Sequence, residues 1–423
     1  MKIHCAALVV LLAIPDASSA QSTAQPPMTM QHQHDTASSP WHLMQDASLF
    51  LTANHQGGPR GGSDFGSQNW WMGMARRPIG EGTLTFNLML SLDAATLGKD
   101  GYRELFQVGE ALHDRPLIDR QHPHDVLMQA AAVWRVPLVN DFELTLAGAP
   151  VGEPALGPVA FMHRSSAAMN PTAPLSHHTL DSTHIAMEVL TAGLDRGPFA
   201  VQTSIFHGRE PDENRWDLID PGALDSWSIR GWYRPRPSVA VQASVGFLSH
   251  PEELEPGDVV RSTASVSWNR KQGPHATALT VAFGRNDKVD FNYNAFLSEV
   301  THTFGAMTAF ARFEALQVET DLLRFGVHPG SDPHLLDVHG LGLEIPASPP
   351  STVQALTLGA ARTVSRWSDW DIDAGADLTF YGVPTAFKAT HGNHPTSFHV
   401  FIRVRPPAPM GRMVDGTMTR MMK

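Results

Sequence analysis

The chain of 423 residues contains a single cysteine, Cys5, which lies before a short apolar run at residues 6–14. A lipidated cysteine would follow such a run, so this position argues against a lipid anchor. Residues 1–20 combine a positive start, this run and small residues at the end, which is typical of a cleaved secretory signal. The mature chain would then have no cysteine and no disulfide.

The chain also lacks long hydrophobic runs. After residue 20 no stretch approaches the roughly 18 apolar residues of a membrane-spanning helix, which excludes a helical membrane protein. A β-barrel is not excluded, because alternate residues of a barrel strand are polar. The mature part exceeds the roughly 250–300 residues at which one soluble core stops growing, yet no linker divides it. A single closed sheet accounts for both observations.

Three further features are missing. Positive charge is in deficit, with a formal net charge of −11, which argues against a nucleic-acid partner. No glycine-rich phosphate-binding loop leads into a helix. No internal repeat of the length of a propeller blade is visible, which disfavours a large soluble β-propeller.

Residues 82–93 show the pattern that is present instead. Leu84, Phe86 and Leu88 alternate with Thr85 and Asn87, which is the period of a β-strand with one apolar and one wetter face. The run is about as long as a tilted transmembrane strand. The alternation recurs and predicts sixteen strands at 47–54, 66–76, 82–93, 124–136, 141–149, 182–193, 198–207, 225–234, 238–248, 261–270, 275–284, 294–304, 306–317, 353–364, 371–381 and 396–405.

The connections between these strands alternate between short turns and long loops, as in outer-membrane barrels. Residues 338–345 could be a strand by pattern, but counting them gives an odd number and reverses every later connection, so we place them in a loop. We therefore expect an all-β transmembrane antiparallel barrel of 16 strands, with 14 and 18 as alternatives. The expected organisation is a signal peptide at 1–20, a disordered arm at 21–45, the barrel at 46–406 and a methionine-rich tail at 407–423.

This combination of signal, strands and loops resembles bacterial outer-membrane porin-type barrels. The segments DRQHPHD (119–125), GEPALGPVAFMHR (152–164) and LDSTHI (180–185) are similar to stretches of a group of proteobacterial barrels associated with metal resistance. The resemblance implies a Gram-negative outer membrane with its lipid and lipopolysaccharide, insertion by the barrel assembly machinery, and a homo-oligomer as one option. One departure is that such barrels usually end on an aromatic residue, whereas here a tail follows Pro406.

Histidine and methionine are abundant, at 22 and 17 residues. Imidazole and thioether groups suit copper, and the soft methionine sulfur suits Cu(I). The arm resembles the histidine- and methionine-rich leaders of the copper resistance protein B family of outer-membrane barrels. No metal is required for the fold, but a copper ion is a candidate ligand. The candidate residues in the arm are Met28, Met30, His32, His34, His42 and Met44.

A second set of residues is expected to line the pore or its loops. On the inner parity, His184 and Glu188 could meet Arg135 and Gln129 inside the lumen. The loop histidines could bind a metal or a solute, or could pin an inward-folded loop through hydrogen bonds. The full set is His122, His124, Asp125, Arg135, His163, His177, His178, His184, Glu188, Arg312, Glu314 and Arg403.

An enzymatic function is disfavoured. Ser182 and His184 share a face of the predicted strand, but residues i and i+2 are too far apart for a nucleophile–base hydrogen bond. The group Ser176, His177 and Asp181 is the other candidate, and no phospholipase-type motif accompanies it. The sequence thus predicts a porin-like barrel that passes or binds a small solute or metal ion, with copper the leading candidate. The alternatives are a non-conducting structural or assembly barrel and, further behind, an outer-membrane lipase-type enzyme.

Overall fold

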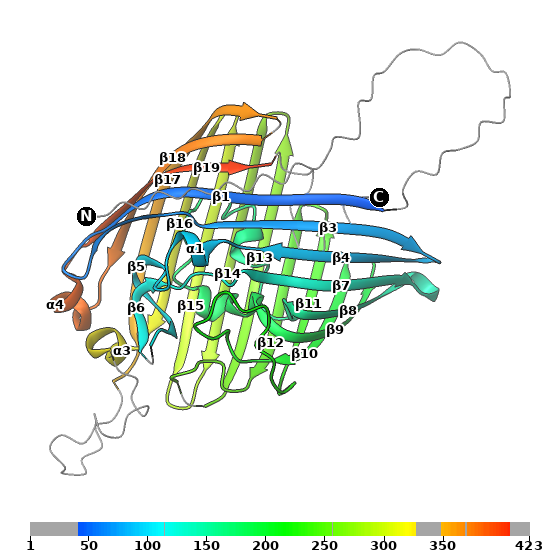
Figure 1. Ribbon diagram of the computed structural model, residues 1–423, viewed down its shortest axis with the longest axis horizontal. Helices are drawn as coiled ribbons and strands as arrows, with labels where there is room; N and C mark the ends of the chain where they lie inside the picture. The colour runs from blue at the N-terminus through cyan, green and yellow to red at the C-terminus, as the bar shows by residue number, and fades with distance from the viewer. Residues whose placement is uncertain (1–40, 114, 256, 327–347, 369, 407–423) are drawn as a thin grey trace. The chain divides into compact units, whose positions relative to one another are not determined.

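Sixteen long antiparallel strands form a closed barrel in the computed structural model, which describes residues 41–406 except 114, 256, 327–347 and 369 (Figure 1). Each strand pairs with the next along the chain, and β19 pairs with β1 to close the wall. The wall strands are β1 (His42–Gln56), β3 (Asn69–Ile79), β4 (Gly82–Leu90), β7 (Leu127–Pro137), β8 (Phe142–Gly152), β9 (Ala186–Arg196), β10 (Phe199–His207), β11 (Ser226–Arg236), β12 (Val239–Leu248), β13 (Val259–Gln272), β14 (His275–Asp287), β15 (Asn292–Phe304), β16 (Met307–Val318), β17 (Ser351–Trp367), β18 (Trp370–Gly382) and β19 (Thr396–Arg405).

Each predicted strand corresponds to one of these wall strands, so the predicted barrel and its strand number are confirmed. The signal peptide, most of the arm, the tail and the segment 338–345 lie outside the described residues. Within the described part of the chain, no helix is long and apolar enough to span a membrane.

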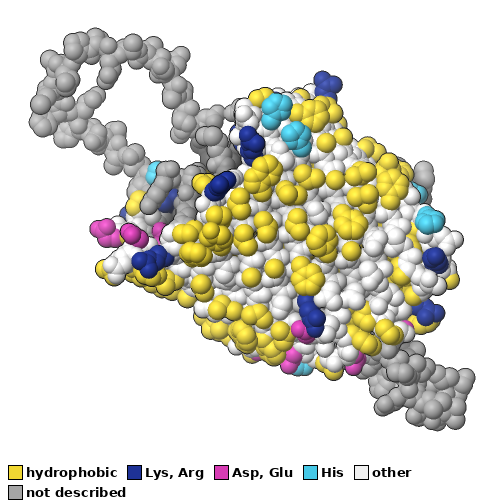
Figure 2. Space-filling model, turned by 180° about the vertical axis from the view of Figure 1, so that it is seen from behind, with side chains coloured by type: hydrophobic (Ala, Val, Ile, Leu, Met, Phe, Trp, Pro, Cys, Tyr) yellow, Lys and Arg dark blue, Asp and Glu magenta, His cyan; other side chains and the backbone are white. Residues whose placement is uncertain are grey.

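The alternation of side chains follows the prediction closely. On β19, Phe398, Val400 and Ile402 are 41–53% exposed, whereas His399, Phe401 and Arg403 on the opposite face are at most 3% exposed. Figure 2 shows hydrophobic side chains spread over the outside of the barrel. The wall is therefore apolar outside and largely polar inside, which is the arrangement of a membrane-spanning barrel.

Three of the strand starts that differ from the prediction change the position of candidate residues. β1 begins at His42, so His42 and Met44 belong to the wall and not to the arm. β7 begins at Leu127, and β9 begins at Ala186. His124 and His184 consequently lie in the connections before these strands. Polar contacts within those connections replace the backbone hydrogen bonds between neighbouring strands.

The two long connections before β7 and β9 fold into the barrel. The first contains α1 (Asp93–Thr96) and a two-stranded sheet of β5 (Tyr102–Ala111) and β6 (Pro116–Gln121). The second contains the 3-10 turn η2 (Phe161–His163), the helix α2 (His177–Leu180) and the 3-10 turn η3 (Ser182–His184). Both connections pack against the inner face of the wall, and together we call them the plug. The remaining elements are β2 (Gly62–Gly66), η1 (Val139–Asp141), α3 (Thr320–Phe325), η4 (Thr385–Phe387) and α4 (Lys388–His391).

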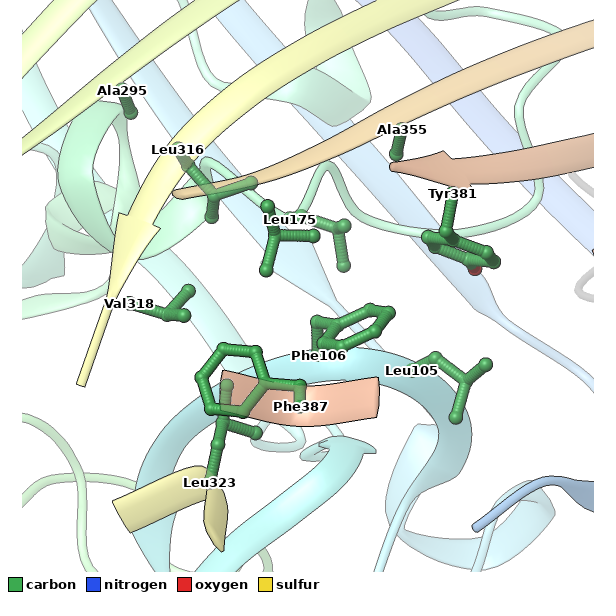
Figure 3. Packing of buried hydrophobic residues seen from close by; sticks show 11 residues of the cluster. Leu105, Phe106, Leu175, Ala295, Leu316, Val318, Leu323, Ala355, Tyr381 and Phe387 are labelled. Carbon is green, nitrogen blue, oxygen red and sulfur yellow. The ribbon is translucent and has the colours of Figure 1, made fainter. Parts of the chain in front are cut away.

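An apolar cluster holds the first of these loops against the wall (Figure 3). Phe106 of β5 is fully buried and its ring centroid lies 5.4 Å from that of Tyr381 on β18. Leu316 of β16 and Val353 of β17 complete the wall side of the cluster. Because burying such a side chain contributes roughly 1.5–3 kcal/mol, the loop is fixed mainly by apolar packing at this end of the barrel.

Candidate functional site

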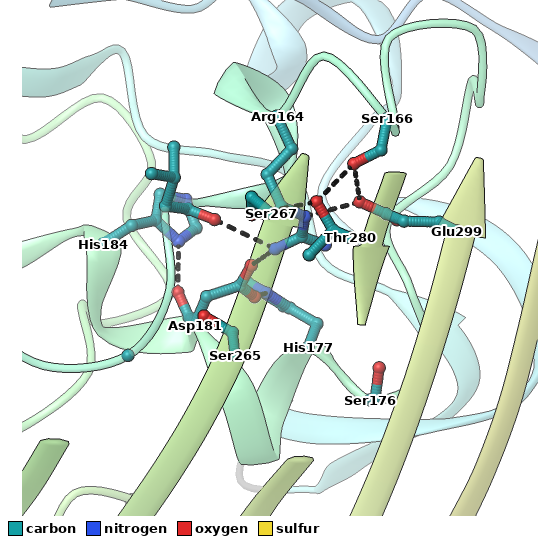
Figure 4. Close-up of polar contacts among 12 residues, drawn as sticks. Arg164, Ser166, Ser176, His177, Asp181, His184, Ser265, Ser267, Thr280 and Glu299 are labelled. Atoms are coloured by element: carbon teal, nitrogen blue, oxygen red, sulfur yellow. Dashed lines mark hydrogen bonds and ion pairs between the residues drawn. The ribbon is translucent and has the colours of Figure 1, made fainter. Parts of the chain in front are cut away.

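A buried ion network fastens the second loop to the wall (Figure 4). Nε of Arg164 donates to Glu299 of β15 at 2.6 Å, and its Nη1 donates to Asp181 at 2.5 Å. The three side chains are at most 2% exposed. Nη1 also donates to the carbonyl oxygen of Val159 at 3.0 Å. This arrangement compensates the charges of three groups that would be costly to bury alone.

The predicted lumen residues Arg312, Glu314 and Arg403 all lie on the inner face and contact the same loop. Arg312 donates to the carbonyl oxygen of Thr172 at 3.1 Å, and Glu314 accepts from the hydroxyl of Ser176 at 2.7 Å. Arg403 pairs with Asp373 at 2.7 Å and donates to the carbonyl oxygen of Ala168. These charged side chains hold the second loop inside the barrel and also make the lumen polar.

The two loops bring five histidines together. Ring centroids lie 5.1 Å apart for His177 and His178, 5.3 Å for His177 and His184, and 5.6 Å for His124 and His184. The ring of His122 lies 5.8 Å from that of His178. The sequence named all five residues, but only the folding of two separate loops into one lumen places them in contact. We call these five residues the histidine cluster.

Three rings of the histidine cluster are oriented through Nδ1. This atom lies 2.8 Å from Asp93 Oδ2 in His124, 2.6 Å from Asp181 Oδ1 in His177, and 2.9 Å from the Asp181 carbonyl oxygen in His184. Nε2 of His124 and of His184 is buried with no hydrogen-bond partner in the described part of the chain. A metal-ligating histidine usually has one ring nitrogen hydrogen-bonded to an oxygen, while its other ring nitrogen is left for the metal.

Carboxylates surround the same cluster. Glu110 of β5 lies 3.0 Å from His122 Nε2 and also pairs with Arg215, which reaches Asp125 at 3.1 Å. Burial would raise the pKa of Glu110, but Arg215 and His122 lower that pKa to about 2. Burial raises the pKa of Asp125 to about 7, although Arg215 opposes this rise. Glu110 is therefore the ionised carboxylate next to His122 at neutral pH.

A cavity of about 150 Å³ with mixed polar and apolar lining lies in the lumen away from the histidine cluster. Arg135 pairs with Glu143 at 3.4 Å, and Arg230 pairs with Glu153 at 3.5 Å. Three arginines, Arg76, Arg135 and Arg230, line the space with one carboxylate, Glu153, so positive groups outnumber negative ones at its surface. Its lining includes Met44, Met74, Asn87, Gln129, Arg135 and Arg230.

A cluster of methionines lines the inner face of the wall, and the sequence interpretation missed it. Met72 on β3 lies opposite Met89 on β4, and Met44 on β1 lies opposite Met74 on β3. The signal was available, since all four residues lie on the inner parity of their strands. We define the methionine cluster as five buried residues and two that pack against them, namely Met72, Met74, Met89, Met128 and Met187, with Met44 and Met162.

The remaining predicted residues lie elsewhere. Glu188 was expected to point towards Arg135, but it has a φ of 53° and accepts from the backbone of Gly222 at 3.1 Å. Leu190 and Met187 of β9 pair with Ile205 and His207 of β10, so β9 contains one extra residue here. This extra residue breaks the alternation of inward and outward side chains at Glu188. His163 packs against Trp70 of β3, with ring centroids 5.0 Å apart. Met28, Met30, His32 and His34 lie outside the described residues.

The two serines considered for nucleophilic chemistry are engaged with other groups. The Ser176 hydroxyl donates to Glu314 at 2.7 Å, and the Ser182 hydroxyl accepts from Arg261 at 2.8 Å. His177 does pair with Asp181, but Ser176 is not bonded to this histidine in the described structure. The geometry offers no support for a Ser–His–Asp arrangement.

Glu104 on β5 provides a pH-dependent prediction. Burial raises the pKa of this carboxyl to about 7, although His399 and Arg312 oppose the rise. A raised carboxyl pKa means that ionisation opposes folding once the pH exceeds the unfolded value near 4.5. Since one pKa unit corresponds to about 1.4 kcal/mol, we expect Glu104→Gln to stabilise the barrel by about 2 kcal/mol at pH 8. Unfolding curves at pH 4 should show no such gain; an equal gain at both pH values would contradict this account.

Comparisons with known proteins identify no family for this chain. No protein-family model matches the chain, and no curated protein is significantly similar to it. An anion-selective porin from Comamonas acidovorans matches with a TM-score of 0.49 and 11% identity, covering 86% of this chain and 99% of that one. OprB of Pseudomonas putida matches with a TM-score of 0.49 and 10% identity, covering 87% and 94%. OmpF of Salmonella typhi matches with a TM-score of 0.47 and 9% identity, covering 85% and 97%. At these values no function of those proteins is carried over.

Proposed function

We propose that the chain is a porin-like barrel of the bacterial outer membrane that passes or binds a small solute or metal ion, with copper the leading candidate. The membrane location rests on the closed wall, because a barrel without free strand edges and with an apolar exterior suits a bilayer. The role in passage or binding rests on the polar lumen, which the two inward loops narrow.

The methionine cluster is the single observation that carries the copper assignment. Thioether sulfur is a soft ligand that favours Cu(I), and here seven such groups gather on one side of the lumen. Met74 and Met44 also border the cavity of about 150 Å³, so the cluster adjoins space within the lumen. Methionine is also a common gap filler in apolar cores, which makes a direct test necessary.

Passage is tested with the purified full chain in planar bilayers and in liposomes. We expect discrete conductance steps in potassium chloride, and entry of Cu(I), supplied with ascorbate, into liposomes that contain a Cu(I)-selective chelator. Conductance steps without Cu(I) entry would support a pore for another solute and would reject the copper assignment.

Replacing the methionine cluster isolates the contribution of sulfur. A variant with Met72, Met74, Met89, Met128 and Met187 changed to leucine keeps the apolar volume, so it should fold at a cost below about 1.5 kcal/mol per site. Cu(I) entry should fall by about an order of magnitude while potassium conductance is retained. The matched control is the pair Met169→Leu and Met307→Leu, because Met169 is buried in a separate cluster and Met307 is exposed. Equal Cu(I) entry in all three proteins would reject the sulfur pathway.

The second candidate is a non-conducting structural or assembly barrel. The observation that favours it is the almost complete burial of Arg164, Asp181 and Glu299 across the lumen. Absence of conductance in both the wild type and a variant with the plug released would support this candidate over a pore.

A further inference from the structure

Within the histidine cluster, His178 at the start of α2 stands out. Neither of its ring nitrogens, both buried, has a hydrogen-bond partner in the described part of the chain. Its nearest carboxylate is Glu210, whose Oε1 lies 3.7 Å from Nδ1, and the other oxygen of Glu210 is also buried without a hydrogen bond. Leaving such polar atoms buried and unsatisfied typically costs about 1–3 kcal/mol each, so a missing partner is indicated.

The space around His178 is closely defined by the backbone. A Cβ atom built on Gly109 would lie 2.3 Å from Cε1 of this ring, and Gly109 has a φ of 130°. Only glycine can occupy this position without displacing the ring. β5 therefore holds the His178 ring against the other histidines.

Three histidines of the cluster can reach one ion. Each of His122, His177 and His178 offers a ligand atom that lies within 4.8 Å of those of the other two. Around an ion with bonds of about 2.0–2.1 Å, neighbouring nitrogens lie roughly 3.3 Å apart. Small rotations of the rings would close the remaining distance.

The contacts of His122 point to the same ligand. Its Nδ1 lies 3.1 Å from the Pro123 carbonyl oxygen, and its Nε2 lies 3.0 Å from Glu110 Oε1. A neutral imidazole carries only one N–H, so the lone pair of its other ring nitrogen must face an oxygen. A cation between Nε2 and the carboxylate would satisfy both atoms.

Carboxylates beside His178 also suit a cation, since Glu210 Oε1 lies 3.7 Å from its Nδ1. His178, Glu210 and Glu252 form a second group of potential ligand atoms within 4.8 Å of one another. The site is thus rich in imidazole nitrogen with carboxylates alongside.

We propose that His122, His177 and His178 bind a divalent transition-metal ion in the lumen, with Cu²⁺ bound more tightly than Zn²⁺. Imidazole ligands suit both ions, and Cu²⁺ has the higher affinity in the series of divalent metals. Glu110 and Glu210 lie next to the ligands and balance the charge of the ion.

A short turn joins this site to the methionine cluster. Phe161 packs its ring 5.3 Å from that of His177, and the following residue, Met162, packs against the methionine cluster. An imidazole site for Cu²⁺ and a thioether site for Cu(I) would thus both contact one 3-10 turn. The inference deepens the proposed function and rests on it for its biological role, but metal binding itself does not depend on an open pore.

The test is a Cu²⁺ titration of the full chain in detergent, followed by electron paramagnetic resonance. We expect hyperfine splitting from imidazole nitrogens in the wild type. His178→Gln should weaken binding by at least about tenfold and reduce the number of coupled nitrogens. Because the ring nitrogens of His178 make no hydrogen bond in the described structure, and its backbone bonds do not depend on the side chain, this change should leave folding intact, which heat-modifiable gel migration verifies.

Two controls separate this site from other histidines. His275 and His302 form an exposed pair with ring centroids 6.4 Å apart, so replacing both with alanine matches the chemistry elsewhere in the barrel and should not change the spectrum. A variant with His32→Ala and His34→Ala removes ligands from the arm and should also retain the signal. Loss of the signal in the arm variant, or an unchanged spectrum and affinity in His178→Gln, would overturn the proposal. Binding that persists without conductance would reject only passage through the lumen.

Discussion

Replacing Arg164 with methionine is expected to release the second loop from the barrel wall and to raise the single-channel conductance several-fold. The change leaves Asp181 and Glu299 buried without their shared cation, although the volume of the side chain is largely kept. Breaking a buried ion pair from one side typically costs about 3–5 kcal/mol. The loop can avoid this cost by moving its carboxylate into water, and that movement widens the lumen.

The measurement is single-channel conductance in planar bilayers, together with limited proteolysis of residues 153–185. The matched control is Arg285→Met, because Arg285 pairs with Asp287 at 2.6 Å but both side chains are more than one third exposed. Such an exposed pair contributes at most about 1 kcal/mol, so conductance should not change. If Arg164→Met has the conductance and protease resistance of the wild type, the ion network does not hold the plug.

A positive charge on the outer face at mid-height should destabilise the barrel nearly as strongly. Leu358 is 48% exposed near the middle of β17, where it lies opposite Leu378 of β18. Arginine at the midplane of a bilayer costs about 2–4 kcal/mol on a barrel surface. We therefore expect Leu358→Arg to lower the unfolding free energy in liposomes by about this amount.

Position along the same strand provides the control for this experiment. Val364 is 58% exposed near the short-turn end of β17, where arginine should cost only about 0–1 kcal/mol. Unfolding by denaturant, followed by tryptophan fluorescence, measures both variants. Equal destabilisation at the two positions would show that Leu358 does not face hydrocarbon.

The strand pattern of the sequence was sufficient to predict the wall. The local sequence of each strand shows which residues face outward, because neighbouring side chains alternate between the two faces. The same rule places Met72 and Met74 on the inner face of β3. It failed at Glu188, because the bulge in β9 inserts one residue and reverses the parity there.

The histidine cluster shows what the sequence could not provide. The sequence identified all five histidines and both loops as candidates, but it did not show which of the histidines contact one another. His122 and His178 are brought together by the fold of loops that have no periodic pattern, and Arg164 finds Glu299 across 135 positions of the chain. No local signal encodes such a pairing.

The sequence by itself determined a closed wall of sixteen strands with an apolar exterior, since that information is repeated locally in every strand. Only the tertiary structure decided what fills the interior, because the plug is held by contacts between residues distant in the chain. The metal-binding geometry that we propose belongs to this second kind of information.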